Sequence, residues 1–265
     1  MNSILRRRNV LGRVIAVANQ KGGTAKTTTA VNLGAYLAMA GRRVLLVDMD
    51  PQGNASSGLG IDKRAVESCV YSVLINEAEI EKAIMNTRVQ GLDIVPATLN
   101  LAGAEVEMVN LMSREQRLRR ALEPVRVIYD YCLVDCPPSL GLLTVNALTA
   151  ADSVLVPIQC EYYALEGLGQ LMRTIELVKR HLNAELKIEG LVMTMFDART
   201  NLSQQVVEDV RQNSGQYVFK AVIPRNVRLS EAPSYGVPIS MYDDKSKGAE
   251  AYRCLAHEIM EREGA

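Results

Sequence analysis

The sequence has no long uninterrupted apolar run, although 48% of its 265 residues are hydrophobic. No window contains about 18 consecutive apolar residues, so we expect no transmembrane helix. The first twelve residues include Arg6, Arg7 and Arg8 and lack the apolar stretch of a signal peptide. These absences predict a protein of the cytoplasm that has no membrane among its partners.

The sequence also has no excess of charge of either sign. Its 30 Lys and Arg residues balance 30 Asp and Glu residues, so the formal net charge is zero. A neutral chain is unlike a constitutively basic protein that coats nucleic acid. The five cysteines are odd in number and include no Cys-x-x-Cys pair, which indicates reduced thiols rather than a disulfide framework.

No internal repeat, low-complexity tract or linker rich in Pro, Gly or Ser divides the chain. A length of roughly 250 residues suits one large α/β domain. We therefore expect a single domain over residues 1–265, in which residues 1–12 form a flexible N-terminal arm.

Short apolar runs alternate with stretches that have helical spacing. The runs are almost continuously apolar, as expected for parallel strands that are covered on both faces. The predicted strands span residues 13–19, 43–50, 92–97, 131–137, 153–159, 191–196 and 218–224. The predicted helices span residues 27–40, 165–182, 201–213 and 248–263. This alternation indicates an α/β fold, a doubly wound and mostly parallel sheet of about 7–8 strands with helices on both faces.

The most informative segment leaves the first predicted strand and opens the first predicted helix. Its sequence is ANQKGGTAKTT, at residues 18–28. In this context, backbone N–H groups and the helix N-terminus can bind phosphate, Lys26 can reach the outer phosphates, and the Thr27 hydroxyl can ligate Mg²⁺. The segment departs from G-x-x-x-x-G-K-[ST], because Gln20 and Ala25 occupy the glycine positions, and it carries a further lysine, Lys21.

Carboxylates follow two of the other predicted strands. Asp48 and Asp50 stand two residues apart and share one side of the chain, at the edge where α/β sheets bind ligands. Another apolar run leads to Asp135, which fits a Walker B carboxylate that holds Mg²⁺. A phosphate loop followed by these carboxylates predicts a site for a nucleotide and magnesium.

At these residues the chain resembles the ParA/Soj family of chromosome- and plasmid-partition ATPases, which carry a deviant Walker A motif. The resemblance implies a P-loop NTPase fold, bound ATP or ADP with Mg²⁺, and slow hydrolysis of ATP. It also implies a homodimer with ATP, non-specific binding of double-stranded DNA on the nucleoid, and stimulation by a ParB-type centromere-binding protein. The matching blocks are ANQKGG…KTTTAVNLG (18–34), VLLVDMDPQGNASSGLG (44–60), VDCPPSLGLLTVNAL (134–148), EYYALEGL (161–168) and VIPRNVRLSEAPSYG (222–236).

The resemblance also implies roles for individual residues. Lys21 resembles the additional lysine that reaches the partner subunit's nucleotide across the dimer, and Asp50 resembles the carboxylate that positions or activates the attacking water. Asp48 and Asp135, with Thr27, support the metal. Pro224 and Asn226 lie where the family contacts adenine. The implied phosphate-binding residues are Gly22, Gly23, Thr24, Ala25, Lys26, Thr27 and Thr28, with Lys26 also catalytic.

Ala25 departs from the family pattern, which has glycine immediately before the Walker lysine. A positive φ at this position would cost alanine roughly 1–2 kcal/mol. We therefore predict that Ala25 slows the turnover of ATP, against the alternative that it is a tolerated variant. A nucleotide-gated DNA-binding switch with negligible hydrolysis is the corresponding alternative function.

Basic residues are unevenly spread along the neutral chain. Residues 1–47 contain eight Lys and Arg residues and no acidic residue, and residues 211–230 also lack an acid. The resemblance favours the second group as the DNA-binding residues. This group consists of Arg211, Lys220, Arg225 and Arg228. The predicted DNA-binding residues are Arg211, Lys220 and Arg228, of which Arg228 is the leading candidate.

Two related classes of ATPase compete with this interpretation. A MinD-like membrane ATPase would end in a basic amphipathic helix, whereas the tail from Gly248 carries more Glu than Arg. A protein like the nitrogenase iron protein would need cysteines that hold a shared cluster. Cys132 and Cys136 flank a predicted strand and are expected in the core, as are Met193 and Met195.

Overall fold

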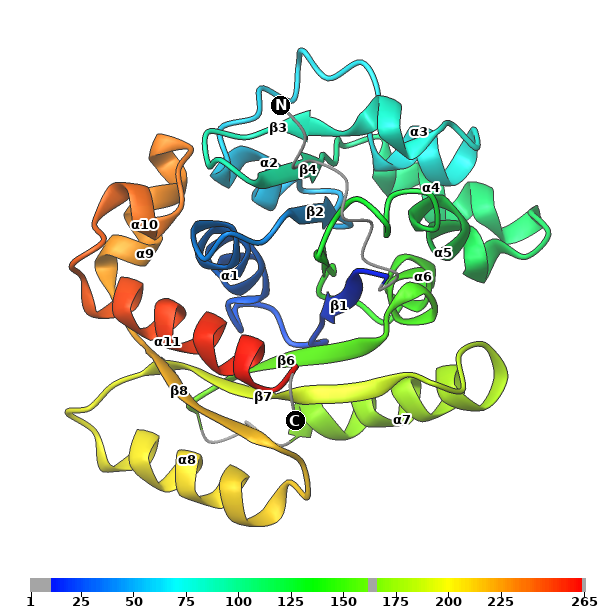
Figure 1. The fold of residues 1–265 in the computed structure, drawn as a ribbon. Coiled ribbons are helices and arrows are strands. Elements are labelled where there is room, and N and C mark those ends of the chain that lie inside the picture. The colour runs from blue at the N-terminus through cyan, green and yellow to red at the C-terminus, as the bar shows by residue number, and fades with distance from the viewer. Residues whose placement is uncertain (1–10, 162–165, 264–265) are drawn as a thin grey trace.

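Eight strands form one sheet in the computed structural model, which describes residues 11–161 and 166–263 (Figure 1). Their order across the sheet is β3-β4-β2-β5-β1-β6-β7-β8. All neighbours pair in parallel except β3 and β4, which are antiparallel. The strands are β1 (Arg13–Val17), β2 (Val44–Asp48), β3 (Met85–Asn86), β4 (Leu92–Val95), β5 (Tyr131–Asp135), β6 (Ser153–Gln159), β7 (Lys187–Phe196) and β8 (Val218–Pro224).

Helices cover both faces of this sheet (Figure 1). The helices packed on one face are α1 (Lys26–Met39), α2 (Asn54–Gly58), α9 (Val227–Glu231), α10 (Ile239–Tyr242) and α11 (Lys247–Glu261). Those on the other face are α3 (Val70–Ile75), α4 (Leu101–Glu107), α5 (Arg117–Leu122), α6 (Leu142–Ala150), α7 (Glu166–His181) and α8 (Asn201–Asn213). Short 3₁₀ turns complete the connections: η1 (Ile80–Ala83), η2 (Met108–Asn110), η3 (Arg114–Gln116) and η4 (Ala232–Tyr235).

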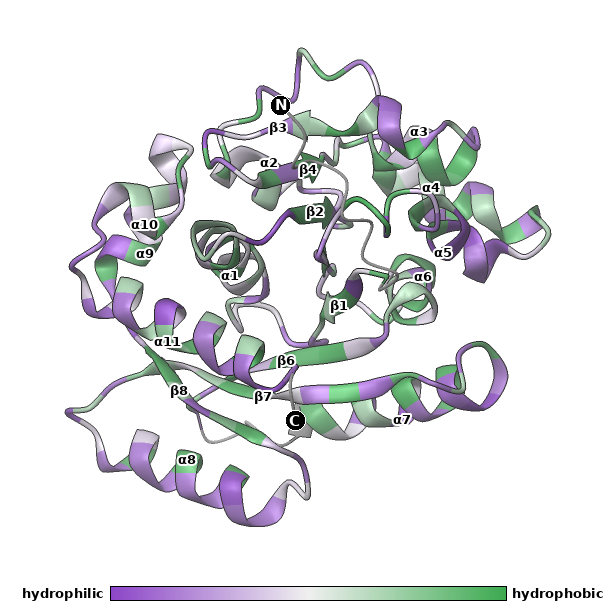
Figure 2. Cartoon of the chain, in the orientation of Figure 1, coloured by the Kyte–Doolittle hydropathy of each residue, from purple (hydrophilic) through white to green (hydrophobic). Residues whose placement is uncertain are grey.

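The alternation of side chains along each strand divides the core into two layers. On β1, Val14 and Ala16 pack into one layer, whereas Ile15 and Val17 pack into the other. Because both layers are apolar, the central strands are hydrophobic along most of their length and carry charged residues only at their ends, as Figure 2 shows. The doubly wound, mostly parallel sheet predicted from the continuous apolar runs is therefore confirmed.

The prediction missed the strand β3 and every helix shorter than ten residues, including α6. The two-residue strand β3 is too short to give a pattern, and it forms the antiparallel edge of the sheet. Helix α6 is buried on almost every side, so its sequence has no polar face that would give a helical period. Most of the expected N-terminal arm, residues 1–10, lies outside the described residues, but Gly12 is fixed, since its N–H donates to the carbonyl oxygen of Arg126 at 2.7 Å.

The cysteines of β5 lie in the core as expected. Cys132 and Cys136 are buried, and burial raises the pKa of Cys132 to about 12, so its thiol is inert. Met193 is also buried, but the prediction was wrong for Met195, which is half-buried and has a left-handed φ of 54°. Within residues 11–161 and 166–263, no helix is both long enough and apolar enough to cross a membrane.

Candidate nucleotide site

The predicted site residues meet at the carboxyl edge of the sheet. The chain leaves β1 into the phosphate loop, and β2 and β5 end side by side, with Asp48 paired in register with Asp135. Because β5 lies between β1 and β2, the two carboxylates lie close to the loop that opens α1. A parallel sheet with this order gathers ligand-binding groups from distant parts of the chain.

The phosphate loop turns sharply before α1. Gly23 and Ala25 both have left-handed backbone angles, with φ of 75° and 64°. Helix α1 begins without a side-chain cap and without an acidic residue in its first turn, so neither its N-cap residue nor its first turn supplies an anion to its N-terminal N–H groups. An uncapped helix N-terminus of this kind favours a bound phosphate.

The two lysines of the loop have different environments. Lys26 is only 7% exposed, and its Nζ donates to the carbonyl oxygen of Lys21 at 3.1 Å, so it folds back into its own loop. Burial lowers the pKa of Lys26, and the nearby carboxylates oppose this effect, Asp135 most strongly. The Lys21 side chain is 38% exposed, and its Nζ contacts Glu161 Oε2 at 3.1 Å. Of the two lysine side chains, that of Lys26 is directed into the phosphate loop, and that of Lys21 is directed away from it toward Glu161.

Asp135 fits a cation site. Neither of its carboxylate oxygens has a hydrogen-bond partner among the described residues, although the residue is fully buried. Burial raises the pKa of Asp135 well above its usual range, the Asp48 carboxylate adds to the rise, and the Thr27 hydroxyl acts in the opposite direction. A buried carboxylate with both oxygens free, close to a hydroxyl, suits Mg²⁺, which prefers oxygen ligands.

Asp48 and Asp50 differ from Asp135 because protein groups already contact them. Asp48 accepts hydrogen bonds from Ser56 N, Ser56 Oγ and Asp50 N at 2.8, 2.7 and 3.2 Å. Burial raises the pKa of Asp48 to about 6, and these hydrogen bonds oppose the rise. Asp50 is 8% exposed, and its Oδ1 accepts from Gln52 N at 2.9 Å.

A cavity of about 330 Å³ adjoins the phosphate loop and includes the residues predicted to contact adenine. Pro224 and Asn226 line it together with Ala25 and Thr28. The Asn226 side chain also caps α9, since its Oδ1 accepts from Arg228 N at 2.8 Å. The structure therefore brings together these four residues, which the resemblance assigned to one nucleotide site, from distant parts of the chain.

The cavity also has lining residues that were not predicted, among them Met195 and Tyr252. Met195 lines the cavity from the end of β7, and Tyr252 lines it from α11 while its hydroxyl contacts Thr29 Oγ1 at 3.1 Å. Neither residue lies in a motif, and both occur in apolar stretches that predict core positions. Only the fold brings them to the nucleotide site.

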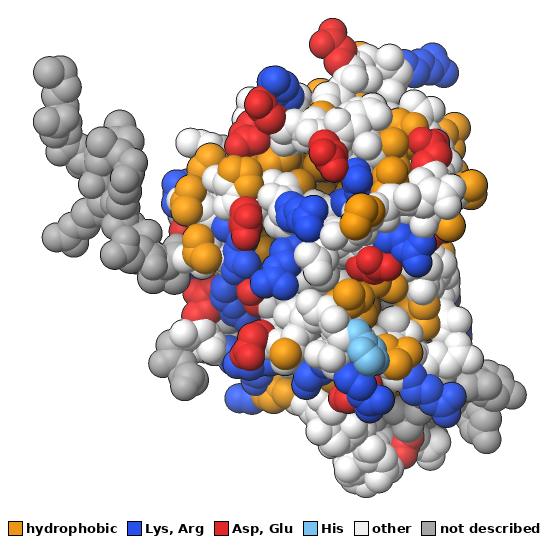
Figure 3. Space-filling model, turned by 90° about the vertical axis from the view of Figure 1, so that its right-hand side faces the viewer, with side chains coloured by type: hydrophobic (Ala, Val, Ile, Leu, Met, Phe, Trp, Pro, Cys, Tyr) orange, Lys and Arg blue, Asp and Glu red, His pale blue; other side chains and the backbone are white. Residues whose placement is uncertain are grey.

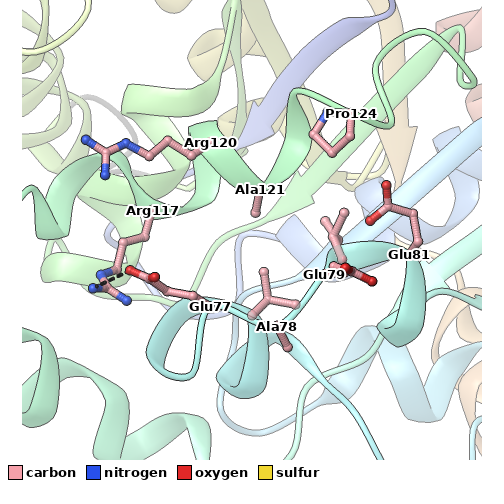
Figure 4. A pocket seen from close by; sticks show the side chains of 10 residues that line it. Glu77, Ala78, Glu79, Glu81, Arg117, Arg120, Ala121 and Pro124 are labelled. Carbon is pink, nitrogen blue, oxygen red and sulfur yellow. Dashed lines mark ion pairs between the residues drawn. The ribbon is translucent and has the colours of Figure 1, made fainter.

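A larger cavity, of about 470 Å³, lies away from this edge, between η1 and α5 (Figure 4). Its rim carries Glu79 and Glu81, and it also contains the Glu77–Arg117 ion pair at 3.1 Å. None of the predicted site residues lines it, and its charged lining is mixed, with Arg117 and Arg120 beside three glutamates. Its size therefore does not make it the nucleotide site.

The predicted DNA-binding residues lie on three successive elements. Arg211 is exposed in the last turn of α8, Lys220 is exposed on the edge strand β8, and Arg228 lies on α9. The Arg228 side chain is 54% exposed and pairs with Glu231 at 3.0 Å and Asp243 at 3.5 Å. The leading candidate is thus available at the surface but already has acidic neighbours.

Three arginines of the acid-free N-terminal stretch, all within the described residues, pair with acidic side chains in the folded chain. Arg13 and Arg42 pair with Glu263 at 3.8 and 3.2 Å, and Arg43 pairs with Asp130 at 3.7 Å. For these three arginines, the positive charge that is concentrated in the sequence is therefore balanced by acidic neighbours in the fold.

The loop that follows Asp50 packs directly against the segment that follows Arg228. Gly60 and Gly236 both have left-handed backbone angles, with φ of 80° and 66°. A Cβ at Gly60 would lie 2.9 Å from the Gly236 carbonyl oxygen, and a Cβ at Gly236 would lie 2.8 Å from Gly60 Cα. Only glycine satisfies both the backbone angles and this close approach.

Replacing Ala25 with glycine is expected to raise the turnover of ATP and to stabilise the fold by up to about 1 kcal/mol, because alanine is strained at a φ of 64°. Steady-state phosphate release and thermal unfolding measure the two effects. The control is Ala40→Gly, an exposed position with an ordinary φ of −78°. An unchanged rate in Ala25→Gly would show that the methyl group does not slow the reaction.

A parallel sheet whose first strand enters a phosphate loop, with a buried lysine beside carboxylates from neighbouring strands, defines a P-loop ATPase. A family profile described as an AAA domain matches residues 12–188. The chain is 62% identical over 249 residues to the sporulation initiation inhibitor protein Soj of Bacillus subtilis (strain 168), covering 94% of this chain and 98% of that protein. It is 58% identical over 253 residues to the chromosome partitioning protein ParA of Myxococcus xanthus (strain DK1622), covering 96% and 89%.

The chain therefore belongs to the ParA/Soj family of chromosome-partition ATPases. Among solved structures, it is similar to cobyrinic acid a,c-diamide synthase from Mycobacterium smegmatis with a bound ATP analogue and magnesium. The TM-score is 0.86 at 42% identity, over 96% of this chain and 97% of that one. The resemblance inferred from the motifs is confirmed.

Proposed function

We propose that this partition ATPase forms a homodimer with ATP that binds DNA non-specifically, and that hydrolysis, stimulated by a ParB-type partner, releases the DNA. The cycle would move or position a chromosome or plasmid on the nucleoid. The proposal of a dimer rests on the contrast between the two lysines. The Lys26 side chain is directed into its own loop, whereas the Lys21 side chain points outward to Glu161. An exposed lysine beside the phosphate loop is available to a second subunit's nucleotide.

Within one protomer, the phosphate-loop backbone from Gly22 to Thr28 would hold the phosphates, and Lys26 would neutralise their charge. Thr27 and Asp135 are the residues that would hold Mg²⁺, which supplies further charge neutralisation when it is bound. Asp50 would orient the attacking water, because its Oδ2 accepts no hydrogen bond from the described residues. The cavity around Pro224 and Asn226 would receive the adenine.

Binding of double-stranded DNA is expected to require ATP and to weaken at least about tenfold between about 50 and about 200 mM salt, because released counterions accompany each phosphate contact. Fluorescence anisotropy with ATP, ADP and no nucleotide measures this. Arg228→Ala should weaken binding, whereas Lys82→Ala, an exposed lysine of η1 on the other face, should not. Binding that is insensitive to salt, or equal without nucleotide, would contradict the proposal.

The position of α11 supports DNA rather than a membrane as the surface that this ATPase binds. The apolar side of α11, including Tyr252, Leu255 and Ile259, is buried against the rest of the chain. A membrane-binding amphipathic helix needs that side free for lipid. Co-sedimentation with anionic vesicles in the presence of ATP would instead favour the MinD-like alternative.

Turnover measured with DNA and the ParB-type partner separates an ATPase cycle from a nucleotide-gated switch. Stimulated phosphate release is the expected result. Bound ATP that remains intact under these conditions would favour the switch. The strained φ of Ala25 would then be the first explanation to test for the lack of hydrolysis.

A further inference from the structure

We infer that Ser56 is a positioning residue for the ATPase reaction, and that with Asp48 it fixes the loop that carries Asp50. This inference rests on the role proposed for Asp50. It assigns to Asp48 a structural task at the nucleotide site in place of the metal-supporting task that the resemblance implied.

Ser56 joins the ends of two neighbouring strands. The residue has no exposed surface, and it lies in α2, just after the Asp50 loop. Its hydroxyl donates to Asp48 Oδ2 at 2.7 Å, at the end of β2, and accepts from Ala97 N at 3.0 Å, just beyond β4. A buried hydroxyl that both donates and accepts has a fixed rotamer.

Asp48 holds both ends of the loop that contains Asp50. Its Oδ1 accepts from Asp50 N at 3.2 Å, and its Oδ2 accepts from Ser56 N at 2.8 Å as well as from the Ser56 hydroxyl. The segment 50–56 is thus closed into a ring by one buried carboxylate. Because an attacking water must be held to within a fraction of an ångström, the ring determines where Asp50 can place it.

The contacts of the two buried carboxylates assign them different tasks. Both Asp48 oxygens already accept hydrogen bonds from the protein, whereas both Asp135 oxygens accept none from the described residues. Three of the roughly four acceptor positions of the Asp48 carboxylate are taken by its own loop, so it has less capacity than Asp135 for a cation or a metal-bound water. Asp135 is therefore the carboxylate that faces Mg²⁺, and Asp48 is the anchor of the loop.

The test compares Ser56→Ala and Ser56→Thr with Ser57→Ala, a control one residue further along α2 whose side chain is exposed. Steady-state turnover gives kcat, the KM for ATP and the Mg²⁺ concentration at half-activation. Calorimetry gives the Kd for ATP with Mg²⁺, and hydrogen exchange reports on the amides of residues 50–56.

Ser56→Ala is expected to lower kcat about 10- to 100-fold, because Asp50 is misplaced, and to speed exchange in residues 50–56. The Kd and the Mg²⁺ half-activation should stay within about twofold, since the phosphate loop and Asp135 are untouched. Ser56→Thr keeps the hydroxyl and should restore most of kcat, and Ser57→Ala should match the parent protein.

A parent-like kcat in Ser56→Ala would overturn the inference, as would a rise in the Mg²⁺ requirement that parallels the loss of turnover. If Ser56→Ala does not fold, Asp48→Asn decides the same question: a lower kcat at an unchanged Mg²⁺ requirement supports the inference, and a raised requirement overturns it. Asp50→Ala, measured alongside, separates the two proposals. Full turnover in Asp50→Ala would refute the role of Asp50, whereas an inactive Asp50→Ala with an active Ser56→Ala would refute only the positioning role.

Discussion

Replacement of Asp50 with alanine is expected to lower ATP turnover by at least about 100-fold while ATP still binds. The carboxylate is 8% exposed and lies at the nucleotide edge, and only its Oδ1 accepts a hydrogen bond from the described residues. Its loss would remove the group proposed to orient the attacking water without altering the phosphate loop. Phosphate release measures turnover, and titration calorimetry measures the affinity for ATP.

The matched control is Asp62→Ala, which removes an exposed carboxylate from the next turn of the chain. Light scattering of the parent protein and of Asp50→Ala with ATP, ADP and no nucleotide tests the dimer in the same experiment. Because Asp50→Ala should retain ATP, we expect it to accumulate as a dimer. Parent-like turnover in this variant would remove Asp50 from the mechanism, and a monomer in every nucleotide state would refute the sandwich dimer.

Methionine in place of Lys26 is expected to weaken ATP binding by about 100-fold or more, because a charged hydrogen bond to the phosphates is lost inside the protein. Lys26 is buried, and its ammonium group is directed into its own loop. Methionine matches the length of the side chain and removes its charge. Equilibrium binding of a fluorescent ATP analogue measures the effect directly.

The second lysine of the loop supplies the matched comparison. Lys21→Met should leave the affinity of the monomer for ATP within about threefold, because the Lys21 side chain is exposed and paired with Glu161. It should nevertheless abolish ATP-dependent dimerisation and stimulated turnover. Equal loss of ATP affinity in the two variants would show that both lysines serve the same subunit's nucleotide.

Part of the site could be predicted from the sequence, because the residues that form it lie within short segments of the chain. A loop between a strand and a helix, a lysine that follows it and a carboxylate at a strand end all lie within short segments, and Lys26 and Asp135 occupy the expected positions. The doubly wound sheet was equally accessible, since strands buried on both faces are apolar throughout. These features depend on neighbours in the chain.

The remaining features depend on contacts between distant segments. Lys21 and Glu161 are 140 residues apart, and no pattern in either segment indicates the pair. The positive φ of Ala25 is a property of the folded loop. From the sequence, its strain energy could be predicted only on the assumption that φ is positive at this position. The three hydrogen bonds to Asp48 likewise distinguish it from Asp135, although both residues follow apolar strands and look equivalent in the sequence.

Charge shows the same difference between the sequence and the fold. The first 47 residues contain no acid, yet Arg13, Arg42 and Arg43 pair with Asp or Glu residues from remote segments. Net charge and its distribution along the chain are additive properties of the sequence. The surface potential is not, because it depends on which residues the fold brings together.

The contact between Gly60 and Gly236 has a mechanical consequence. Most packed segments are separated by side chains, which can change rotamer and absorb small movements. Here two backbones touch with no such layer between them, so a shift of a few tenths of an ångström in one must displace the other. A movement of the loop that follows Asp50 would therefore be transmitted directly to the segment that follows Arg228, because no side chain lies between Gly60 and Gly236 to absorb it.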